Sequence, residues 1–409
     1  FTASTTGTVT GEIVNTTRVS DLTGLTNAQA NAKYTVTLNA ADNSTVTAGQ
    51  LNRIDGGTTE KVDIANVTAL GASDISDLVT LNTNKANFNN ITGVADITLT
   101  DNGGGGLSDV NFGALADVVD NYQTNFKNTV TFKFQAGDTI DIDDSTELGK
   151  FITDIGSSAL TLTDQKVTVD SGTKISVANA RSIAADTTGT VTASIDTAAR
   201  VSALTTLYNP GGGNETNAWT VVISSADKTG STAANLNTIN SATSVAVDLT
   251  EVTALAASDI SDLATLNTNK DGLSNRGNLA SITLTDNGGG GLSDVDFGAL
   301  ADVVDDSQTN FKNTVTFKFQ AGDTIDIDDS TELGKFITDI GSSALTLTDQ
   351  KVTVDSGTKI SVANARSIAA DTTGTVTASI DTAARVSALT TLYNPGGGNE
   401  TNAWTVVIS

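Results

Sequence analysis

The chain has 409 residues, and 47 acidic residues against 22 basic ones give it a net charge of −25 at pH 7. This balance excludes nucleic acid as a partner, because phosphate binding needs rows of lysine and arginine. The absence of cysteine and histidine excludes a disulfide framework, a thiolate metal site and the commonest catalytic base.

Short runs in which threonine alternates with aliphatic residues predict β-strands along the whole chain. In one of them, Ile97 and Leu99 would face one side of a sheet and the intervening threonines the other. The runs recur on average about every 30 residues, which is a typical spacing for a repeat protein. They centre on Val9, Val36, Val62, Ile97, Val130, Leu160, Val191, Val221, Val245, Ile282, Val315, Leu345, Val376 and Val406.

The segments between these runs predict helices. Asp144 and Glu147 have the spacing that caps a helix start, and Gly156 is a natural stop. Ser73 and Ser108 precede similar apolar patterns. The clearest apolar series, at i, i+3, i+4 and i+7, should pack against the sheet. It comprises Leu148, Phe151, Ile152 and Ile155, and it returns as Leu333, Phe336, Ile337 and Ile340.

A strand followed by a helix, repeated with short links, predicts an α/β fold with parallel strands. A doubly wound sheet would be buried on both faces, and the threonines on one face argue against it. We therefore expect a curved parallel β-α solenoid, similar to leucine-rich repeats, with about 30 residues per coil. Curvature follows because strands stack about 4.8 Å apart, whereas helices pack about 8–10 Å apart.

A longer repeat is superimposed on the short one. Residues 97–224 recur as 282–409, an offset of 185 residues, with three substitutions. Asn111 corresponds to Asp296, Asn121 to Asp306 and Tyr122 to Ser307. We therefore divide the chain into a partial unit at 1–96, a full unit at 97–281 and a partial unit at 282–409. We expect these units to form one continuous solenoid with a parallel sheet.

The densest carboxylate cluster lies in 138–147 and returns in 323–332. Calcium takes several carboxylate and carbonyl oxygens, and alternate residues of a strand share a face. One hypothesis is therefore a Ca²⁺ site in each copy, and no other cofactor is predicted. The alternative is that Asp144 and Glu147 cap a helix and the other acids are solvated. The hypothetical ligands are Asp138, Asp141, Asp143, Asp323, Asp326 and Asp328.

The remaining sequence patterns do not indicate a phosphate-binding or catalytic site. The glycine-rich segments 101–106 and 209–215, with copies at 286–291 and 394–400, are interpreted as loops. The first of them lacks the Gly-Lys-Ser/Thr ending of a phosphate-binding loop. No pair of carboxylates stands out as a glycosidase pair among the many surface acids. We therefore predict that the chain is not an enzyme.

Three phrases resemble the repeats of giant cell-surface proteins of marine cyanobacteria, including those of swimming-motility proteins. They are TTGTVTASI at 187–195, ANLNTIN at 234–240 and TALAASDISDL at 253–263. The resemblance implies an acidic, extracellular structural repeat of a cell-surface protein or filament, involved in motility or surface contact. It supplies no catalytic residues.

Two functions therefore remain open. One is this structural role, in which the partners are further copies of the repeats or neighbouring chains. The other is an adhesin-type module that binds glycans or Ca²⁺ on its acidic or concave surface. The chain begins at Phe1, has no methionine and lacks the roughly 20-residue apolar run of a membrane span. We therefore expect a segment of a longer protein, with no membrane span in this part.

Overall fold

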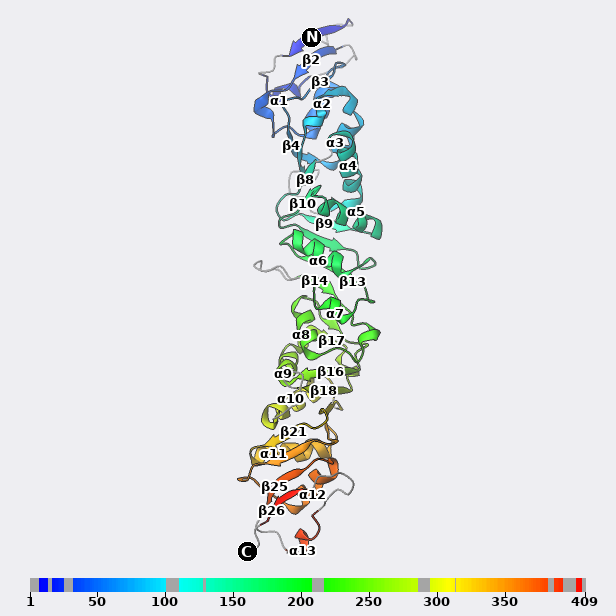
Figure 1. Ribbon diagram of the computed structural model, residues 1–409. Coiled ribbons are helices and arrows are strands. Elements are labelled where there is room, and N and C mark those ends of the chain that lie inside the picture. Colours follow the sequence, from blue (N-terminus) through cyan, green and yellow to red (C-terminus); the bar gives the residue numbers. More distant parts are fainter. Residues whose placement is uncertain are drawn as a thin grey trace. The chain divides into compact units, whose positions relative to one another are not determined.

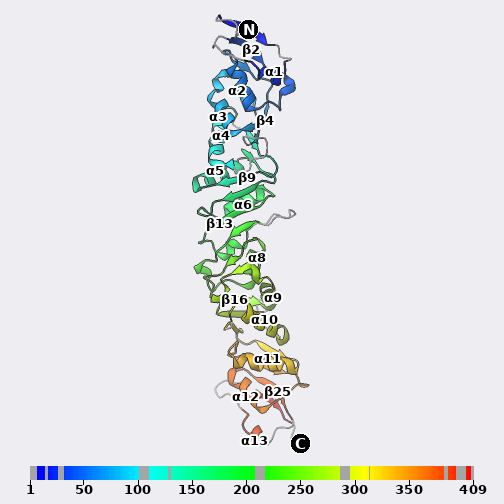
Figure 2. The ribbon, with the colours of Figure 1, turned by 180° about the vertical axis from the view of Figure 1, so that it is seen from behind.

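The fold is seen in a computed structural model (Figures 1 and 2). It describes residues 7–13, 17–25, 32–100, 110–127, 130–207, 217–285, 295–312, 314–381, 386–392 and 402–406, with the backbone alone at 110–111 and 295–296. The chain forms two compact units, each described here by itself. The first comprises 1–196 and 208–219, and the second comprises 197–207 and 220–409.

The protein is a mixed α/β structure with several parallel sheets. The α-helices described in the first unit are α1 (Val19–Leu22), α2 (Ala48–Gly56), α3 (Ile75–Thr83), α4 (Phe112–Asn125), α5 (Ser145–Gly156) and α6 (Val177–Asp186). Those in the second are α7 (Val201–Leu204), α8 (Ala233–Ser241), α9 (Ile260–Thr268), α10 (Phe297–Asn310), α11 (Ser330–Gly341), α12 (Val362–Asp371) and α13 (Val386–Leu389). Short 3₁₀ helices are η2 (Ala40–Asp42), η3 (Lys85–Asn87), η4 (Ile91–Gly93), η5 (Ser225–Asp227), η6 (Lys270–Gly272) and η7 (Arg276–Asn278).

The described strands of the first unit form three sheets. One contains β1 (Val9–Ile13), β2 (Ala32–Thr37), β3 (Val62–Asp63) and β5 (Phe88–Asn89). The β6 sheet contains β4 (Ala69–Asp74), β6 (Asp96–Thr100), β8 (Thr131–Lys133) and β10 (Leu160–Thr161). The β9 sheet contains β7 (Val110–Asn111), β9 (Thr139–Ile142), β11 (Lys166–Val169), β13 (Val191–Ile195) and β12 (Lys174–Ile175), and β14 (Ala218–Thr220) also pairs with β13.

The second unit repeats this arrangement. A two-stranded sheet contains β15 (Val247–Asp248) and β17 (Leu273–Ser274). The β18 sheet contains β16 (Ala254–Asp259), β18 (Ser281–Thr285), β20 (Thr316–Lys318) and β22 (Leu345–Thr346). The β21 sheet contains β19 (Val295–Asp296), β21 (Thr324–Ile327), β23 (Lys351–Val354), β25 (Val376–Ile380) and β24 (Lys359–Ile360), and β26 (Ala403–Thr405) also pairs with β25.

The described strands lie in several sheets and not in the single sheet that we expected, and in the middle of each unit neighbouring strands along the chain belong to different sheets. The chain passes from β8 in the β6 sheet to β9 in the β9 sheet and then into α5. The turn between β8 and β9 contains Gly137 at φ 79°, and Asp138 Oδ2 accepts a hydrogen bond of 2.7 Å from Gln135 N. This tight turn ends one strand and redirects the chain into the next. In this part of the molecule, one pass of the chain therefore comprises two strands and the helix that follows them.

Helices α2 to α5 of the first unit follow one another along one side of its strands. Figures 1 and 2 show α2, α3, α4 and α5 in succession, and each contacts the next. The predicted alternation holds for most of β6, where Ile97 and Leu99 are buried while Thr98 is half-buried, but it fails at the last residue, Thr100, which is also buried. The strand prediction fails by one or two residues at five centres, which lie just outside a strand: Val130, Val221, Val245, Val315 and Val406.

Helix α5 shows which side chains hold the helices in place. Leu148, Phe151 and Ile155 are buried as predicted, but Ile152 is only half-buried, because it lies beside that face instead of within it. The Phe151 ring packs edge-on to Phe112 of α4 with centroids 5.1 Å apart, and Phe336 packs on Phe297 at the same distance. Helix α5 is thus held against α4 by an aromatic contact.

Helix starts follow the predicted caps only in part. Asp144 caps α5, accepting hydrogen bonds from Thr146 N at 2.7 Å and Glu147 N at 2.9 Å. Helix α3 begins after Asp74, whereas Ser73 is buried and accepts a hydrogen bond of 2.9 Å from Ala48 N. The predicted cap Ser108 lies outside the described residues, as do the glycine-rich segments 101–106, 209–215, 286–291 and 394–400.

One of the three substitutions changes the core. Tyr122 is fully buried, donates a hydrogen bond of 2.9 Å to Leu78 O and stacks on Phe126 at 3.9 Å between centroids. In the second unit, Ser307 takes this place, and Asn267 Nδ2 donates a hydrogen bond of 3.0 Å to its hydroxyl. Asn267 is 3% exposed there, whereas its counterpart Asn82 is half-buried. The asparagine is therefore more buried in the copy where the smaller serine replaces the phenol.

Replacing the central aromatic of α5 should weaken one unit at a time. We expect Phe151→Ala to lower the free energy of unfolding of the first unit by about 3–5 kcal/mol, because it leaves a cavity beside Phe112. Hydrogen exchange of backbone amides, resolved by unit, measures this loss. Ile152→Ala is the control and should cost less than about half as much. Equal losses from the two variants would show that Phe151 does not hold α5 in place.

Candidate functional site

The predicted calcium ligands have three different surroundings. Asp138 is 2% exposed and belongs to the turn before β9, where its carboxylate binds Gln135 N; Asp323 binds Gln320 N in the same way, also at 2.7 Å. These two carboxylates lie in the protein interior, because they satisfy a backbone donor that the turn leaves free. They are structural parts of the turn.

The other predicted ligands follow the strand. Asp141 lies in β9 and Asp326 in β21, both half-buried, between buried isoleucines that point to the opposite face. Asp143 and Asp328 follow these strands and are exposed. The backbone N–H of Asp143 donates a hydrogen bond of 2.9 Å to Glu147 Oε2, and that of Asp328 makes the equivalent contact.

The structure does not gather the predicted ligands into a metal site. Among the residues that it describes, no group of three or more acidic side chains is placed to hold a metal ion. The turn buries Asp138 and Asp323, while strand alternation sends the remaining ligands, Asp141 with Asp143 and Asp326 with Asp328, to the sheet surface. The predicted pairing of alternate residues on one face is nevertheless visible, because Asp326 and Asp328 line the same hollow.

That hollow lies on the polar face of the β21 sheet and has a volume of about 380 Å³. Parallel pairing places Asp326 opposite Thr353, and Thr353 opposite Thr377. A second row includes Ser379, which pairs with Thr405 on β26. The lining residues are Asp326, Asp328, Thr353, Val354, Asp355, Ser356, Thr377, Ala378, Ser379 and Thr405. The hollow therefore combines three carboxylates with hydroxyl groups, and its lining includes no basic side chain.

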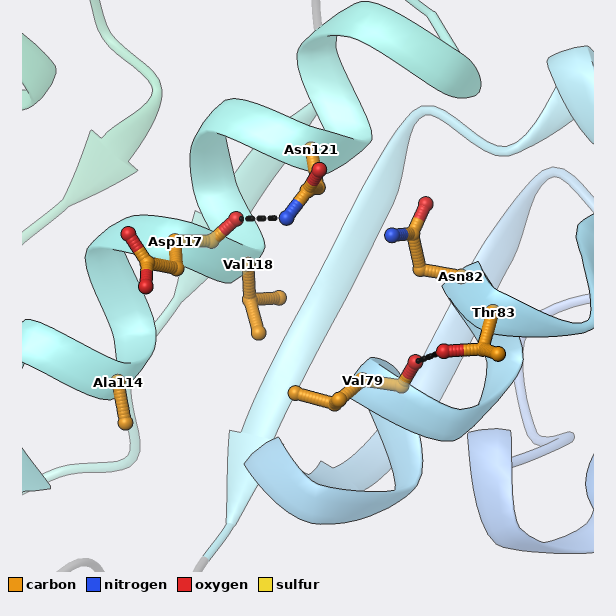
Figure 3. A pocket seen from close by; sticks show the side chains of 7 residues that line it. All are labelled: Val79, Asn82, Thr83, Ala114, Asp117, Val118 and Asn121. Carbon is orange, nitrogen blue, oxygen red and sulfur yellow. Dashed lines mark hydrogen bonds between the residues drawn. The ribbon is translucent and has the colours of Figure 1, made fainter.

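A second hollow, of about 400 Å³, lies between α3 and α4 of the first unit (Figure 3). Val79 is 49% exposed at this groove, and Asp117 is its one charged lining residue. The counterpart of Val79 in the second unit is Ala264. This groove has no grouping of acids, bases or nucleophiles that would support catalysis.

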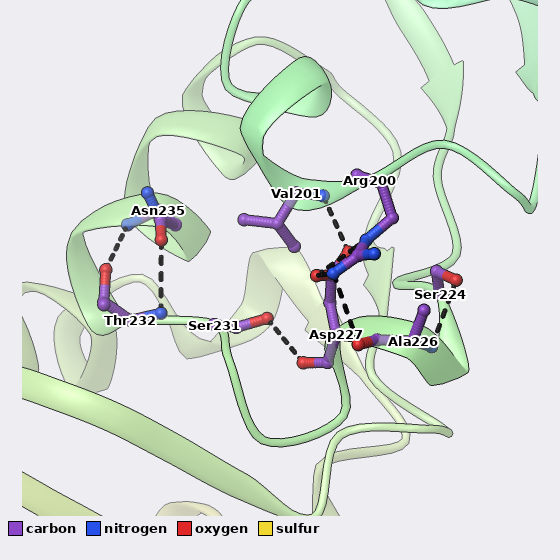
Figure 4. A network of polar contacts seen from close by, with 8 residues as sticks. All are labelled: Arg200, Val201, Ser224, Ala226, Asp227, Ser231, Thr232 and Asn235. Carbon is purple, nitrogen blue, oxygen red and sulfur yellow. Dashed lines mark hydrogen bonds and ion pairs between the residues drawn. The ribbon is translucent and has the colours of Figure 1, made fainter.

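The shortest ion pair described in the second unit joins Arg200 to Asp227 (Figure 4). Arg200 Nη2 lies 2.6 Å from Asp227 Oδ1, and Arg200 Nε lies 2.9 Å from Oδ2. The same Oδ2 accepts a hydrogen bond of 2.9 Å from Val201 N at the start of α7. The hydrogen bond from Arg200 is the largest influence on Asp227 and lowers its pKa, against the opposing effect of burial.

The first unit contains the same device. Arg18 Nη2 lies 2.6 Å from Asp42 Oδ1, and Asp42 Oδ2 accepts a hydrogen bond of 3.0 Å from Val19 N at the start of α1. In both units the aspartate comes from the 3₁₀ helix of the following pass. The pair therefore fastens a short helix to the next pass of chain, which is a structural role.

A buried acid in α5 is a second candidate, because raised carboxyl pKa values are frequent at active sites. Asp154 is 5% exposed, and its Oδ2 atom has no hydrogen-bond partner. Burial, with a smaller contribution from Asp120, raises the pKa of Asp154 to about 6, while Lys150 opposes the shift. Burial likewise raises the pKa of Asp339 to about 6. Neither acid is among the residues that line the three described hollows.

No known protein family matches this sequence, and no curated protein matches it either. None of the helices in the described ranges is both long enough and apolar enough to cross a bilayer.

The Arg200–Asp227 contact should support the second unit in a pH-dependent way. Arg200→Ala removes the charge-assisted hydrogen bonds that Asp227 accepts, so we expect a lower free energy of unfolding of the second unit at pH 7. Because the folded-state pKa of Asp227 is lowered, its stabilising effect is present above the unfolded pKa and is lost as the pH falls through the folded value. Urea unfolding at pH 7 and pH 3 tests this, with exposed Arg366→Ala as control. A loss that does not shrink in acid would contradict it.

Neutralising the buried acids of α5 and α11 should stabilise the protein at neutral pH. A raised folded-state pKa favours folding at low pH, and this contribution is lost as the pH rises through about 6. We therefore expect Asp154→Asn with Asp339→Asn to raise the free energy of unfolding at pH 8 by roughly 1–3 kcal/mol. The gain should vanish near pH 4, where both acids are neutral. Denaturant unfolding from pH 4 to 8 measures it, and a gain independent of pH would count against the assignment.

Proposed function

We propose that this chain is a structural repeat segment of a large extracellular cell-surface or filament protein, with a role in motility or surface contact. The observation that carries the proposal is the repeat itself. The near-identical segments 97–224 and 282–409 show the same order of elements, β6 to β14 in one and β18 to β26 in the other. A repeated supersecondary unit extends a structure by stacking, which suits a fibre or surface layer.

We also propose that the passes form a parallel β-α solenoid of about 30 residues per coil, related to leucine-rich repeats but with two strands in each coil. The supporting evidence lies within each unit. Strands pair in parallel from pass to pass, and successive helices contact each other. A stack of this kind buries each pass against its neighbours and leaves its two ends as the natural places for further copies or neighbouring chains.

Composition supports a non-enzymatic, extracellular role. The absence of cysteine and methionine makes the chain resistant to oxidation, and the absence of histidine removes the usual catalytic base. A net charge of −25 keeps such a surface soluble, and its self-repulsion is screened at seawater-like salt, where the Debye length is only a few ångströms. We propose that its partners are other repeats and not nucleic acid.

A specific observation favours the adhesin-type alternative as a second candidate. The hollow on the β21 sheet combines Asp326, Asp328 and Asp355 with threonine and serine hydroxyls. Such groups can accept hydrogen bonds from a polar ligand such as a glycan. The structural role and a binding role on this face are compatible, because the hollow occupies a surface separate from the helices that contact one another.

Brief protease treatment of intact source cells tests the proposed location. We expect peptides from 97–224 and 282–409 to be released into the medium within minutes, while a cytoplasmic marker enzyme stays inside the cells. Antibodies raised against the chain should label unpermeabilised cells in electron micrographs. Labelling and peptide release that require permeabilised cells would rule out a cell-surface protein.

A further inference from the structure

We infer that the groove between α3 and α4 of the first unit binds the same groove of a second copy of this chain, with the two copies related by a two-fold axis. This inference deepens the proposed structural role, in which the partners are further copies, and rests on it. Three features of the molecule carry it: the shape of the groove, its low charge, and the residues that replace it in the second unit.

The groove combines a protruding apolar side chain with a hollow beside it. Val79 of α3 is 49% exposed, whereas Val118 of α4 is buried. Figure 3 shows both valines pointing into the space between the two helices, where the hollow has a volume of about 400 Å³. A two-fold axis beside Val79 would bring the Val79 side chain of each copy over the hollow of the other, so that both exposed valines become buried.

Two side-chain donors at the groove are already satisfied inside their own helices (Figure 3). Thr83 Oγ1 donates a hydrogen bond of 2.9 Å to Val79 O on α3. Asn121 Nδ2 donates one of 2.7 Å to Asp117 O on α4. Covering this face leaves both donors paired, so the contact avoids the cost of burying unsatisfied polar groups.

Charge favours a second copy over a basic partner. The chain carries a net charge of −25, so two copies repel one another over most of their surfaces. Asp117 is the one charged residue that lines the groove. Lys150 Nζ lies 2.9 Å from Asp117 Oδ1 and 3.5 Å from Asp120 Oδ2, which partly neutralises both acids. A basic partner would be drawn to the more acidic surfaces, whereas a second acidic copy can approach where charge is low.

The second unit carries a variant of the same face. Helices α9 and α10 differ from α3 and α4 at only two exposed positions: Val79 corresponds to Ala264, and Asn121 corresponds to Asp306. The first exchange removes the protruding side chain. The second adds a carboxylate, which a contact with another acidic copy would have to desolvate. The contact therefore belongs to the first unit alone.

Sedimentation equilibrium of the whole chain measures this association at about 0.15 M and about 0.5 M salt. We expect a monomer–dimer equilibrium with a dissociation constant on the order of 0.1–1 mM, because the contact lies at the small end of protein interfaces. The higher salt should strengthen association about threefold, because it screens the repulsion between the acidic copies.

Variants of the groove decide whether it is responsible. Val79→Ala with Asn121→Asp gives the first unit the surface of the second, and this double variant should weaken association at least about tenfold. Val245→Ala is the control, because it truncates another exposed valine that does not line the groove and should leave association unchanged. All three positions are exposed, so we expect both variants to fold.

A thiol tests the two-fold axis directly, because the chain has no cysteine of its own. A disulfide needs two Cα atoms within about 7 Å of each other. The groove contact brings the two copies of position 79 together, so Val79→Cys should form a linked dimer under mild oxidation. The matched control is Ala264→Cys in the second unit, which should link at least about tenfold more slowly.

A chain that stays monomeric at about 1 mM in both salts would overturn the inference and leave the groove to a partner of another kind. Unchanged association in the double variant would overturn it as well, and so would equal rates of linking for the two cysteine variants. None of these results bears on the cell-surface location, which protease treatment tests separately.

Discussion

The structure depends on the fastening of each pass of chain to the next without disulfides. Sheet hydrogen bonds do this inside the strands, but the turns between strands need other donors. Glutamine side chains supply them: Gln135 Nε2 donates to Leu99 O at 3.1 Å, and Gln165 Nε2 donates to Gln135 O at 2.8 Å. Thr187 Oγ1 continues the series by donating to Gln165 O at 2.6 Å. This line of polar side chains, in which Gln135 is half-buried while Gln165 and Thr187 are buried, connects successive passes through their turns.

The same constraint explains several features that composition alone leaves unexplained. Gly189 lies so close to the carbonyl oxygen of Gln165 that an added Cβ would clash with it. Glycine is therefore required at position 189, beside the glutamine that connects the turns. Gln320, Gln350 and Gly374 make the equivalent arrangement in the second unit. Both the glutamine hydrogen bonds and the close contact of the glycine recur. The repeated sequence therefore reproduces the contacts between passes as well as the secondary structure.

Local patterns predicted much of this protein, and contacts between passes account for what they missed. The Asp144 cap and the alternation of Ile97 and Leu99 depend on residues a few positions apart, so the sequence suffices for them. The second sheet, the burial of Asp138 and the hydroxyl of Ser379 depend on which residue of one pass lies opposite which residue of another. Alternating carboxylates were a visible signal for the hollow, but nothing local marks Ser379 as buried.

The exchange of Tyr122 for Ser307 has a consequence for how such a chain can change length. The residues that adapt to it, Asn82 and Asn267, are the same type and lie upstream of the near-identical segments. Either version of the segment is therefore preceded by a helix whose asparagine can accommodate it. Recombination between the two copies of the segment would join the first part of one copy to the last part of the other, and the two parts would be compatible. Arrays could thus gain or lose whole repeats over generations while every resulting protein retained a packed core.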